Sequence, residues 1–251
     1  MADSEGSGTT AAAGASPHEI VRRTVRAHTA AALAAARTAQ SLAAAAAEAM
    51  QIAERAFAEL QQNAAVRREV AGLHCRKYCA HCCYKTVSVT PAEAIYLADY
   101  VKATLRPRAL AKLKARLRDL DETTRGMTPV ERGRARLPCA LLVGRLCSAH
   151  AARPASCRGF NSRDVRACEQ ALKRRDVAIP VYRPQYQIFA EAHLGLRQGL
   201  ADCGLRSTHV ELTAALRIAL DSPDAADRWL AGEPIFKDAA GPCGPGPAAT
   251  P

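Results

Sequence analysis

The stretch HCRKYCAHCCYK, residues 74–85, places four cysteines within nine positions. Cys82 and Cys83 are adjacent, and a disulfide between neighbours would strain the backbone because a disulfide needs a particular Cα separation and torsion. The first twenty residues contain neither a basic n-region nor an apolar h-region, so nothing there resembles a secretory signal. We therefore expect a cytoplasmic, reducing environment, in which metal binding is a better interpretation of these thiols than disulfide bonding.

Six more cysteines follow at wider spacing, and of these Cys203 and Cys243 are expected to stand apart from the metal ligands. A tetrahedral structural zinc site needs four nitrogen or sulfur donors, and donors two to four residues apart can reach one ion from a single turn. Neighbouring side chains tend to point apart, so the adjacent pair favours two metals or one multinuclear cluster over a single ion. Eight thiolates would satisfy two four-cysteine sites, with zinc in both or an iron–sulfur cubane in one. We predict that these ligands converge in one region and are Cys75, Cys79, Cys82, Cys83, Cys139, Cys147, Cys157 and Cys168.

The formal net charge of +11 is concentrated in the cysteine-bearing part of the chain. Lysine plus arginine number 7 against 7 acidic residues in 1–74, 19 against 7 in 75–168, and 9 against 10 in 169–251. Because metal ligands are thiolates, much of the arginine is expected to compensate their negative charge. A nucleic-acid face is disfavoured, since the sequence lacks interleaved aromatic residues and any helix-turn-helix or zinc-finger spacing.

Composition favours a mainly α fold, with a small irregular cysteine-rich core surrounded by helices. Alanine dominates, aromatic residues make up 4% of the chain, and charges interrupt every long apolar run, so we expect no membrane-spanning segment. Gly and Pro are absent between Pro17 and Ala71, which predicts one long alanine-rich helix or two. This helical segment either docks a protein partner or is functionally silent. The predicted organisation is a disordered 1–16, an alanine-rich helical segment 17–73, a metal-binding domain 74–235 and a disordered tail 236–251.

Capping signals and leucine spacing predict the helices that must position the thiols. Thr90-Pro91-Ala92-Glu93 combines a capping residue, a proline at the first helical position and an acid in the first turn, and predicts a helix to about Leu105. Leucines at three- and four-residue spacing predict a second helix over 107–122. We expect a loop over 123–138. The remaining predicted helices are 184–202, 209–220 and 223–230.

The motifs CRKYCAHCC, PCALLVGRLC and CSAHAARPASCRGF together resemble the YkgJ-type cysteine-cluster family of zinc- or iron-chelating domains. That family has a C-x(2,3)-C-x2-C-C block, then C-P-F-L, then C-x-I-Y-x-x-R-P-x-x-C-R. The resemblance covers roughly 75–168, and the segment ELTAALRIALDSPDAADRWLAGEPIF is similar to a tail found in bacterial members. The matching positions are Cys75, Cys79, Cys82 and Cys83 in the first block, Cys139 in the second, and Cys147, Arg153, Pro154, Cys157 and Arg158 in the third.

Three residues near the third block are candidates for support of the metal site. Arg153 and Arg158 are candidates to lie around the ligands, because guanidinium groups donate strong hydrogen bonds to thiolates and reduce the charge of a site. We expect at least one of these guanidiniums to point toward the cluster or the loop that carries Cys147. His150 stands where the family usually has a tyrosine. It is either an extra ligand or proton-handling group, or a ring that fills the packing position of the tyrosine, and we favour packing.

The resemblance implies metal chelation and does not supply a reaction. The sequence contains no dinucleotide-binding or Walker motif and no evident Ser/His/Asp set. We favour a metal-binding protein whose zinc or iron ions hold the fold or are handled for delivery. The alternative is an iron–sulfur-dependent redox or modification enzyme, since a similar cluster occurs in a flagellin lysine methylase. A zinc-stabilised interaction module is a third possibility.

Overall fold

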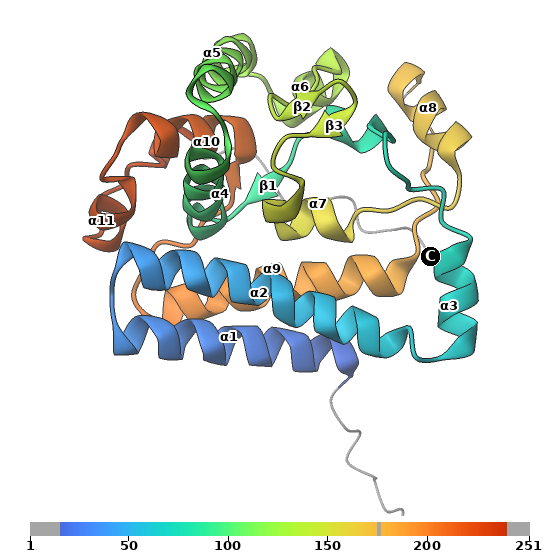
Figure 1. Cartoon of the computed structure of the whole chain (residues 1–251), viewed down its shortest axis with the longest axis horizontal. Helices are drawn as coiled ribbons and strands as arrows, with labels where there is room; N and C mark the ends of the chain where they lie inside the picture. The colour runs from blue at the N-terminus through green and yellow to red at the C-terminus, as the bar shows by residue number, and fades with distance from the viewer. Residues whose placement is uncertain (1–15, 175–176, 240–251) are drawn as a thin grey trace, which may run out of the picture.

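The computed structural model describes residues 16–174 and 177–239 (Figure 1). These residues form α-helices joined by short 3-10 turns and two-residue strands, which confirms the predicted mainly α class. The predicted disordered segment 1–16, apart from Ser16, the end of the predicted tail, and Cys243 lie outside the described residues. No helix in the described part is long and apolar enough to cross a membrane.

The alanine-rich segment forms three helices, α1 (Pro17–Ala35), α2 (Ala39–Leu60) and α3 (Ala64–Ala71), where one or two were predicted. Arg37 lies in the first break because its guanidinium donates to the carbonyl oxygens of Cys203 and Leu230. Thr38 then starts α2, since its hydroxyl accepts a hydrogen bond from the Ser41 N–H. Asn63 caps α3 in the same way. Side-chain capping and tertiary hydrogen bonds therefore end helices that contain no Gly or Pro.

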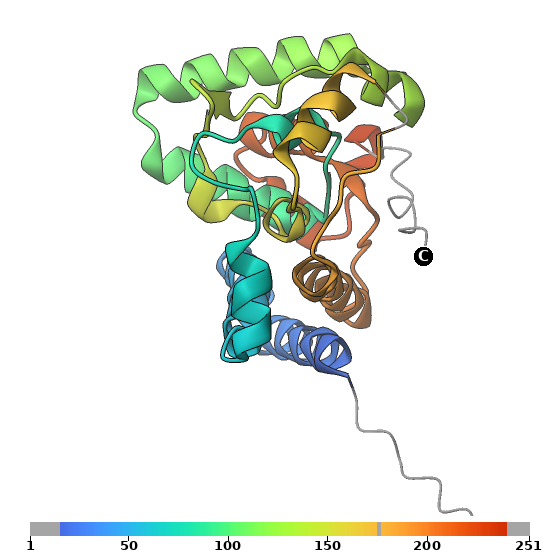
Figure 2. The same cartoon turned by 90° about the vertical axis from the view of Figure 1, so that its right-hand side faces the viewer.

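The rest of the helical scaffold begins with α4 (Pro91–Thr104) and α5 (Pro107–Thr124), close to the predicted bounds. The long helix α9 (Arg183–Asp202) packs with α1 and α2 in one layer, and α5 is the outermost helix on the opposite side (Figure 2). The other elements are η1 (His81–Tyr84), β1 (Ser88–Val89), α6 (Pro129–Ala135), β2 (Leu142–Val143), β3 (Leu146–Cys147), η2 (His150–Ala152), α7 (Ala155–Gly159), α8 (Val165–Lys173), β4 (Val210–Glu211), α10 (Leu212–Asp221), α11 (Ala225–Leu230) and η3 (Lys237–Ala239).

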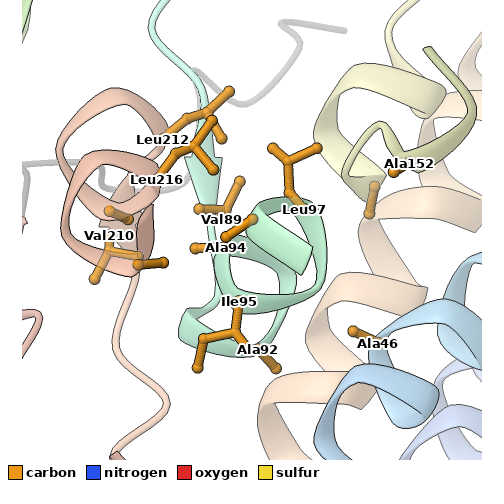
Figure 3. Close-up of a cluster of buried hydrophobic side chains, with 14 of the residues drawn as sticks. Ala46, Val89, Ala92, Ala94, Ile95, Leu97, Ala152, Val210, Leu212 and Leu216 are labelled. Carbon is orange, nitrogen blue, oxygen red and sulfur yellow. The ribbon is translucent and has the colours of Figure 1, made fainter. Parts of the chain in front are cut away.

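The hydrophobic core is centred on α4, which packs on α2 and on α10. Figure 3 shows α4 side chains such as Leu97 between Ala46 of α2 and Leu216 of α10. Strand β1 pairs antiparallel with β4, so that Val89 and Val210 close one side of this core. One cluster of buried side chains extends from α1 to η3. The alanine-rich helices and the helices around the cysteines therefore share a core.

Two predicted irregular segments contain ordered helical turns. The predicted loop 123–138 contains α6, which begins with a capping box between Thr128 and Glu131. This box repeats the Thr-Pro-x-Glu pattern that predicted α4, so the expectation of a loop was wrong. The predicted disordered tail began at residue 236, but Phe236 and Ala239 are buried. Apolar burial therefore holds the chain as far as the last described residues.

Helix α9 approaches α1 closely because two glycines face it. A Cβ at Gly195 would lie 2.4 Å from the carbonyl oxygen of Arg22, and a Cβ at Gly199 would lie 2.6 Å from the Cβ of Thr29. Both distances are shorter than van der Waals contact. The close packing of α9 on α1 therefore depends on the absence of side chains at Gly195 and Gly199.

Gly195→Ala is expected to lower the free energy of unfolding by about 1–3 kcal/mol, because the added methyl group forces α1 away from α9. Urea unfolding followed by circular dichroism measures this change. Gly133→Ala in α6 is the control, since a Cβ there meets no atom within 4 Å. It should be neutral or slightly stabilising, as alanine favours a helix over glycine. Equal effects of the two substitutions would contradict the close-packing argument.

Candidate metal centre

The eight predicted ligands lie on irregular segments and short elements beside the helical core. Cys75 and Cys79 occupy the loop between α3 and η1, and Cys82 and Cys83 lie on η1. The chain from α3 to β1 passes between the β2–β3 hairpin and α8 (Figure 1). The other four positions are Cys139 before β2, Cys147 on β3, Cys157 on α7 and Cys168 on α8.

Backbone contacts bring the first cysteine loop to the start of α8. The His74 N–H donates to the carbonyl oxygen of Ser162 at 2.9 Å, and the Val165 N–H donates to the His74 Nδ1 at 3.1 Å. Helix α8 also packs on η1. Partial burial raises the pKa of the Cys75 thiol, and three neighbouring thiols raise it further. Those neighbours complete what we call the first thiol group: Cys75, Cys79, Cys82 and Cys168.

A second set of contacts joins η1 to the hairpin. The Cys139 N–H donates to the carbonyl oxygen of Cys83 at 2.7 Å, and Cys147 pairs with Leu142 across the hairpin. Burial raises the pKa of the Cys157 thiol, and the thiols of Cys139 and Cys147 are among the neighbours that raise it further. We call these residues the second thiol group: Cys83, Cys139, Cys147 and Cys157.

The adjacent pair on η1 lies where the two groups meet. A hydrogen bond from the Cys83 thiol, assisted by the charge of Arg153, lowers the pKa of Cys82 to about 6. The same hydrogen bond, together with burial, raises the pKa of Cys83. Cys82 is also close enough to shift the pKa of Cys147 and of Cys157. The thiols therefore form one electrostatically connected region with two subdivisions, and Cys82 is its most acidic member.

The pKa values in this region identify the chemistry that it requires. Burial raises the pKa of the Cys139 thiol to about 11 and also raises the pKa values of Cys147 and Cys168. Such thiols ionise at neutral pH only if a cation compensates their charge, and a bound metal ion supplies that compensation. The donor set therefore fits a thiophilic metal. Among the described residues, no three of these donors already stand in a ligating arrangement, so the ligand set itself stays a prediction.

A family model with the signature CxxCxxCC, described as "Putative zinc- or iron-chelating domain", matches residues 74–177. Residues 74–177 are therefore similar to this cysteine-cluster family. The match confirms the resemblance predicted from the motifs, and all eight predicted ligands fall within it. Comparison with curated proteins and with solved structures gives no match. The family supports zinc or iron as the bound metal, without assigning a role to it.

Of the two predicted supporting arginines in the cysteine-cluster domain, only Arg153 lies near thiols. Its charge lowers the pKa values of Cys82, Cys147 and Cys157, against the effect of burial on all three. Arg158 instead pairs with Glu54 on α2 and donates to the carbonyl oxygen of Arg153 at 2.6 Å. It therefore holds the loop that carries Arg153 against the alanine-rich helices.

Two further predictions concern residues around the cluster. The His150 side chain is exposed on η2, so the favoured interpretation, in which the ring fills a packed position, was wrong. Cys203 lies at the end of α9, where its Sγ is 3.8 Å from the carbonyl oxygen of Ala30 on α1. It is thus held by the helical layer, as expected for a cysteine outside the ligand set.

Arg132 is a supporting residue that the sequence analysis missed. It is 6% exposed, and its Nε and Nη1 atoms are buried without a hydrogen-bond partner among the described residues. Its charge acts on two neighbours, the Cys139 thiol and the Glu211 carboxyl, and counteracts the increase that burial causes in both pKa values. A buried guanidinium with unused donors is costly, and an anionic metal–thiolate centre would satisfy it. The missed signal was the capping box, which fixes the start of α6 three residues before this arginine.

Glu93 is a second feature that the sequence analysis used only as a helix signal. It is 2% exposed and its Oε2 accepts from the Thr90 N–H at 2.8 Å, which completes the capping box of α4. Its Oε1 accepts from the Ala155 N–H at 2.9 Å, at the start of the helix that carries Cys157. Burial would raise its pKa, but the interaction with His193 and the backbone N–H groups outweighs burial, so the pKa is lowered.

A directional hydrogen-bond chain continues from Glu93 to Arg197. His193 Nδ1 lies 3.1 Å from Glu93 Oε2, and its Nε2 lies 3.2 Å from His209 Nδ1. His209 Nε2 faces the Arg197 Nη1 at 2.7 Å. Because Arg197 can only donate, His209 Nε2 must accept and its Nδ1 must carry the proton. That proton requires His193 Nε2 to accept, so both imidazoles are neutral between a carboxylate and a guanidinium.

This chain connects the C-terminal helices to two of the ligand-bearing segments. Ser88 Oγ lies 3.0 Å from His209 Nδ1, and the Ser156 hydroxyl donates to the Ser88 carbonyl oxygen at 2.8 Å. Ser88 begins the strand that follows Cys83, and Ser156 precedes Cys157. The buried chain therefore fixes the segments of Cys83 and Cys157 relative to α9.

His209→Asn should make the stability of the protein less sensitive to acid. Burial, assisted by the charge of Arg197, lowers the pKa of His209 from 6.5 to about 4. Between these values the unfolded chain binds more protons, so the free energy of unfolding falls as the pH falls from 6.5 to 4. Because His209 is partly exposed, we expect its share to be about 1 kcal/mol between pH 7 and pH 5. Urea unfolding at both pH values measures the difference from wild type.

Asparagine keeps an N–H donor near the position of Nδ1 but cannot take up the proton. The same substitution at the exposed His28 of α1 is the control and should leave the wild-type dependence unchanged. An acid sensitivity that is the same in wild type and His209→Asn would rule out the neutral imidazole assigned to His209.

Arg132→Met is expected to have opposite effects on metal-free and metal-loaded protein. Removal of a buried guanidinium whose Nε and Nη1 have no hydrogen-bond partner among the described residues should raise the free energy of unfolding of the metal-free form. Loss of a donor beside Cys139 should weaken metal binding about 10-fold or more. Urea unfolding and competition with a chromophoric zinc indicator measure the two effects. Arg134→Met, at an exposed position in the same helix, should change neither, and loss of stability in metal-free Arg132→Met would show that the guanidinium has a protein partner.

Proposed function

We propose that the chain binds zinc or iron at two sites, each formed by four thiolates. The first site consists of Cys75, Cys79, Cys82 and Cys168, and the second of Cys83, Cys139, Cys147 and Cys157. The observation that carries the proposal is the position of η1, which contacts the hairpin segment through Cys83 and also packs on α8. The Cys83 carbonyl oxygen accepts from the Cys139 N–H, whereas η1 packs against α8, which carries Cys168.

The charge balance supports two sites with four ligands each. A single ion cannot compensate eight thiolates, whereas two divalent ions with four thiolates each leave two negative charges per site. A cationic side chain lies near each group to reduce that charge. The Arg153 and Arg132 guanidiniums act on members of the second group, and the charge of Lys85 acts on Cys168 in the first. Bound metals would supply the cross-links that the irregular cysteine segments lack.

The metals are proposed to hold the cysteine segments in place and to be available for metal handling. Cys75 is an exposed ligand, while the thiols of the second group are partly buried behind the hairpin and η1. A ligand at the surface is the natural point at which a metal enters or leaves. The first site is therefore the better candidate for exchange, and the second for a structural role.

Metal content per chain tests the division into two sites. Protein purified anaerobically should contain two metal equivalents by elemental analysis. Cys168→Ser and Cys139→Ser should each lose about one equivalent, because each removes a ligand from a different site. Cys203→Ser is the matched control and should keep both, since that thiol lies against α1. Loss of all metal from either single variant would indicate one multinuclear cluster.

The absorption spectrum separates the proposal from the enzyme alternative. Zinc in both sites gives a colourless protein, and four-thiolate iron gives a coloured one without acid-labile sulfide. A brown protein that contains iron and labile sulfide would instead carry an iron–sulfur cluster. That result would favour an iron–sulfur-dependent redox or modification enzyme over metal handling.

A further inference from the structure

The segments that carry most of the ligands contain no carboxylate. Residues 70–92 and 132–163 include seven of the eight predicted ligands, no aspartate or glutamate, and ten lysines and arginines. Seven thiolates with two divalent ions would carry three negative charges, so compensation of the metal sites does not require ten cations. Most of this positive charge must therefore have another use.

Half of the ten cations have evident partners. Arg153, Arg132 and Lys85 act on thiols, and Arg158 and Arg163 form ion pairs with Glu54 and Glu69. The other half form no ion pair with a carboxylate among the described residues, although the charge of Arg134 acts on the Glu131 carboxyl. They are Arg76, Lys77, Arg134, Arg136 and Arg145.

Exposed apolar side chains lie among these unpaired cations. Tyr78 and Val143 are both 52% exposed, and Leu146 is 40% exposed. The Arg145 Nε donates to the Tyr78 carbonyl oxygen at 3.0 Å, which fixes the tip of the hairpin beside the first cysteine loop (Figure 1). We call this surface the hairpin face: Arg76, Lys77, Tyr78, Val143, Arg145 and Leu146.

The backbone of the hairpin face is held in a costly conformation. Tyr78 has a φ of 69° and Arg145 a φ of 68°, in the left-handed region that disfavours residues with a side chain. Gly144, between Val143 and Arg145, has a φ of 54°. Each non-glycine residue in this region costs about 1 kcal/mol. A tyrosine and an arginine at such positions are better explained by what their side chains bind than by stability.

We propose that the hairpin face docks an acidic segment of a partner protein in which carboxylates alternate with apolar side chains. Lys77 and Arg145 would pair with the carboxylates, while Tyr78, Val143 and Leu146 would cover the apolar side chains. Aliphatic residues and a single tyrosine fit a polypeptide better than single-stranded nucleic acid, which needs several aromatic stacking platforms. The proposal rests on this surface and holds whether the metals are structural or exchanged.

The hairpin face lies next to the proposed metal sites, so a docked partner would affect them. Tyr78 lies between Cys75 and Cys79, and Leu146 precedes Cys147. A partner bound there would contact the loops of both proposed sites and would lie next to the exposed Cys75. Binding of the partner and retention of the metals would then be linked, because both order the same two loops.

Selection from a random peptide library tests the proposal without a known partner. Phage-displayed dodecapeptides are selected on the full-length, metal-loaded protein and counter-selected on the Lys77→Glu/Arg145→Glu variant. We expect the selected peptides to be rich in Asp and Glu with interspersed apolar residues. Charge reversal should weaken their binding at least 10-fold, and Tyr78→Ala should weaken it several-fold. Fluorescence anisotropy of labelled peptides measures both.

The control variant Arg108→Glu/Arg118→Glu changes the net charge equally at exposed positions on α5. It should bind the selected peptides like wild type. Metal content of every variant is measured in parallel, so that loss of the sites is distinguished from loss of the face. Selected peptides without acidic enrichment, or equal weakening by both double variants, would overturn the proposal. Tighter binding of a labelled oligothymidine that is lost on Lys77→Glu/Arg145→Glu would replace it with a nucleic-acid face.

Discussion

Negative charge confined to a small volume is the constraint on which the cysteine region depends. Eight thiols in one electrostatically connected region cannot all ionise in the absence of cations, because burial and mutual repulsion raise most of their pKa values. Cys82 is the exception, since it takes a hydrogen bond from Cys83 and lies near Arg153. One stable thiolate surrounded by neutral thiols is a starting point for metal capture. Each bound cation then lowers the cost of ionising the next ligand.

The helical scaffold solves a different problem, which is to place segments far apart in sequence beside one another. The alanine-rich helices and α9 supply a compact layer, and the two glycines of α9 allow its closest contact. Glu93 connects the helical layer to the site. Its carboxylate caps α4, accepts a hydrogen bond from the start of α7 and pairs with His193 on α9. The cysteine segments therefore pack against this core, and the predicted metal ligands lie beside it.

Local sequence signals predicted most helices and the thiolate character of the site, but they could not predict the long-range contacts. The Thr-Pro-x-Glu pattern at Thr90 predicted α4, and the same pattern at Thr128 was present but not applied, so α6 was missed. Helix breaks such as the one at Arg37 depend on carbonyl groups almost two hundred residues away. The cysteine spacing indicated thiolate ligands and the family, yet no spacing could show that Cys83 contacts Cys139 while η1 packs on α8. The role of Arg132 was equally hidden, since burial of a guanidinium is a property of the packed fold.

Arginines in the cysteine region also differ in role according to what surrounds them, and their sequence context does not reveal this. Arg153 and Arg158 belong to one motif, but the first acts on thiols and the second pairs with Glu54 on α2. Arg132 and Arg134 are two residues apart on one helix, and only Arg132 is buried. The absence of carboxylates from these segments means that the carboxyl group that acts on Cys139, Glu211, comes from another part of the chain. It also leaves the outer cations unpaired, so the composition that suits the metal sites creates a basic surface around them.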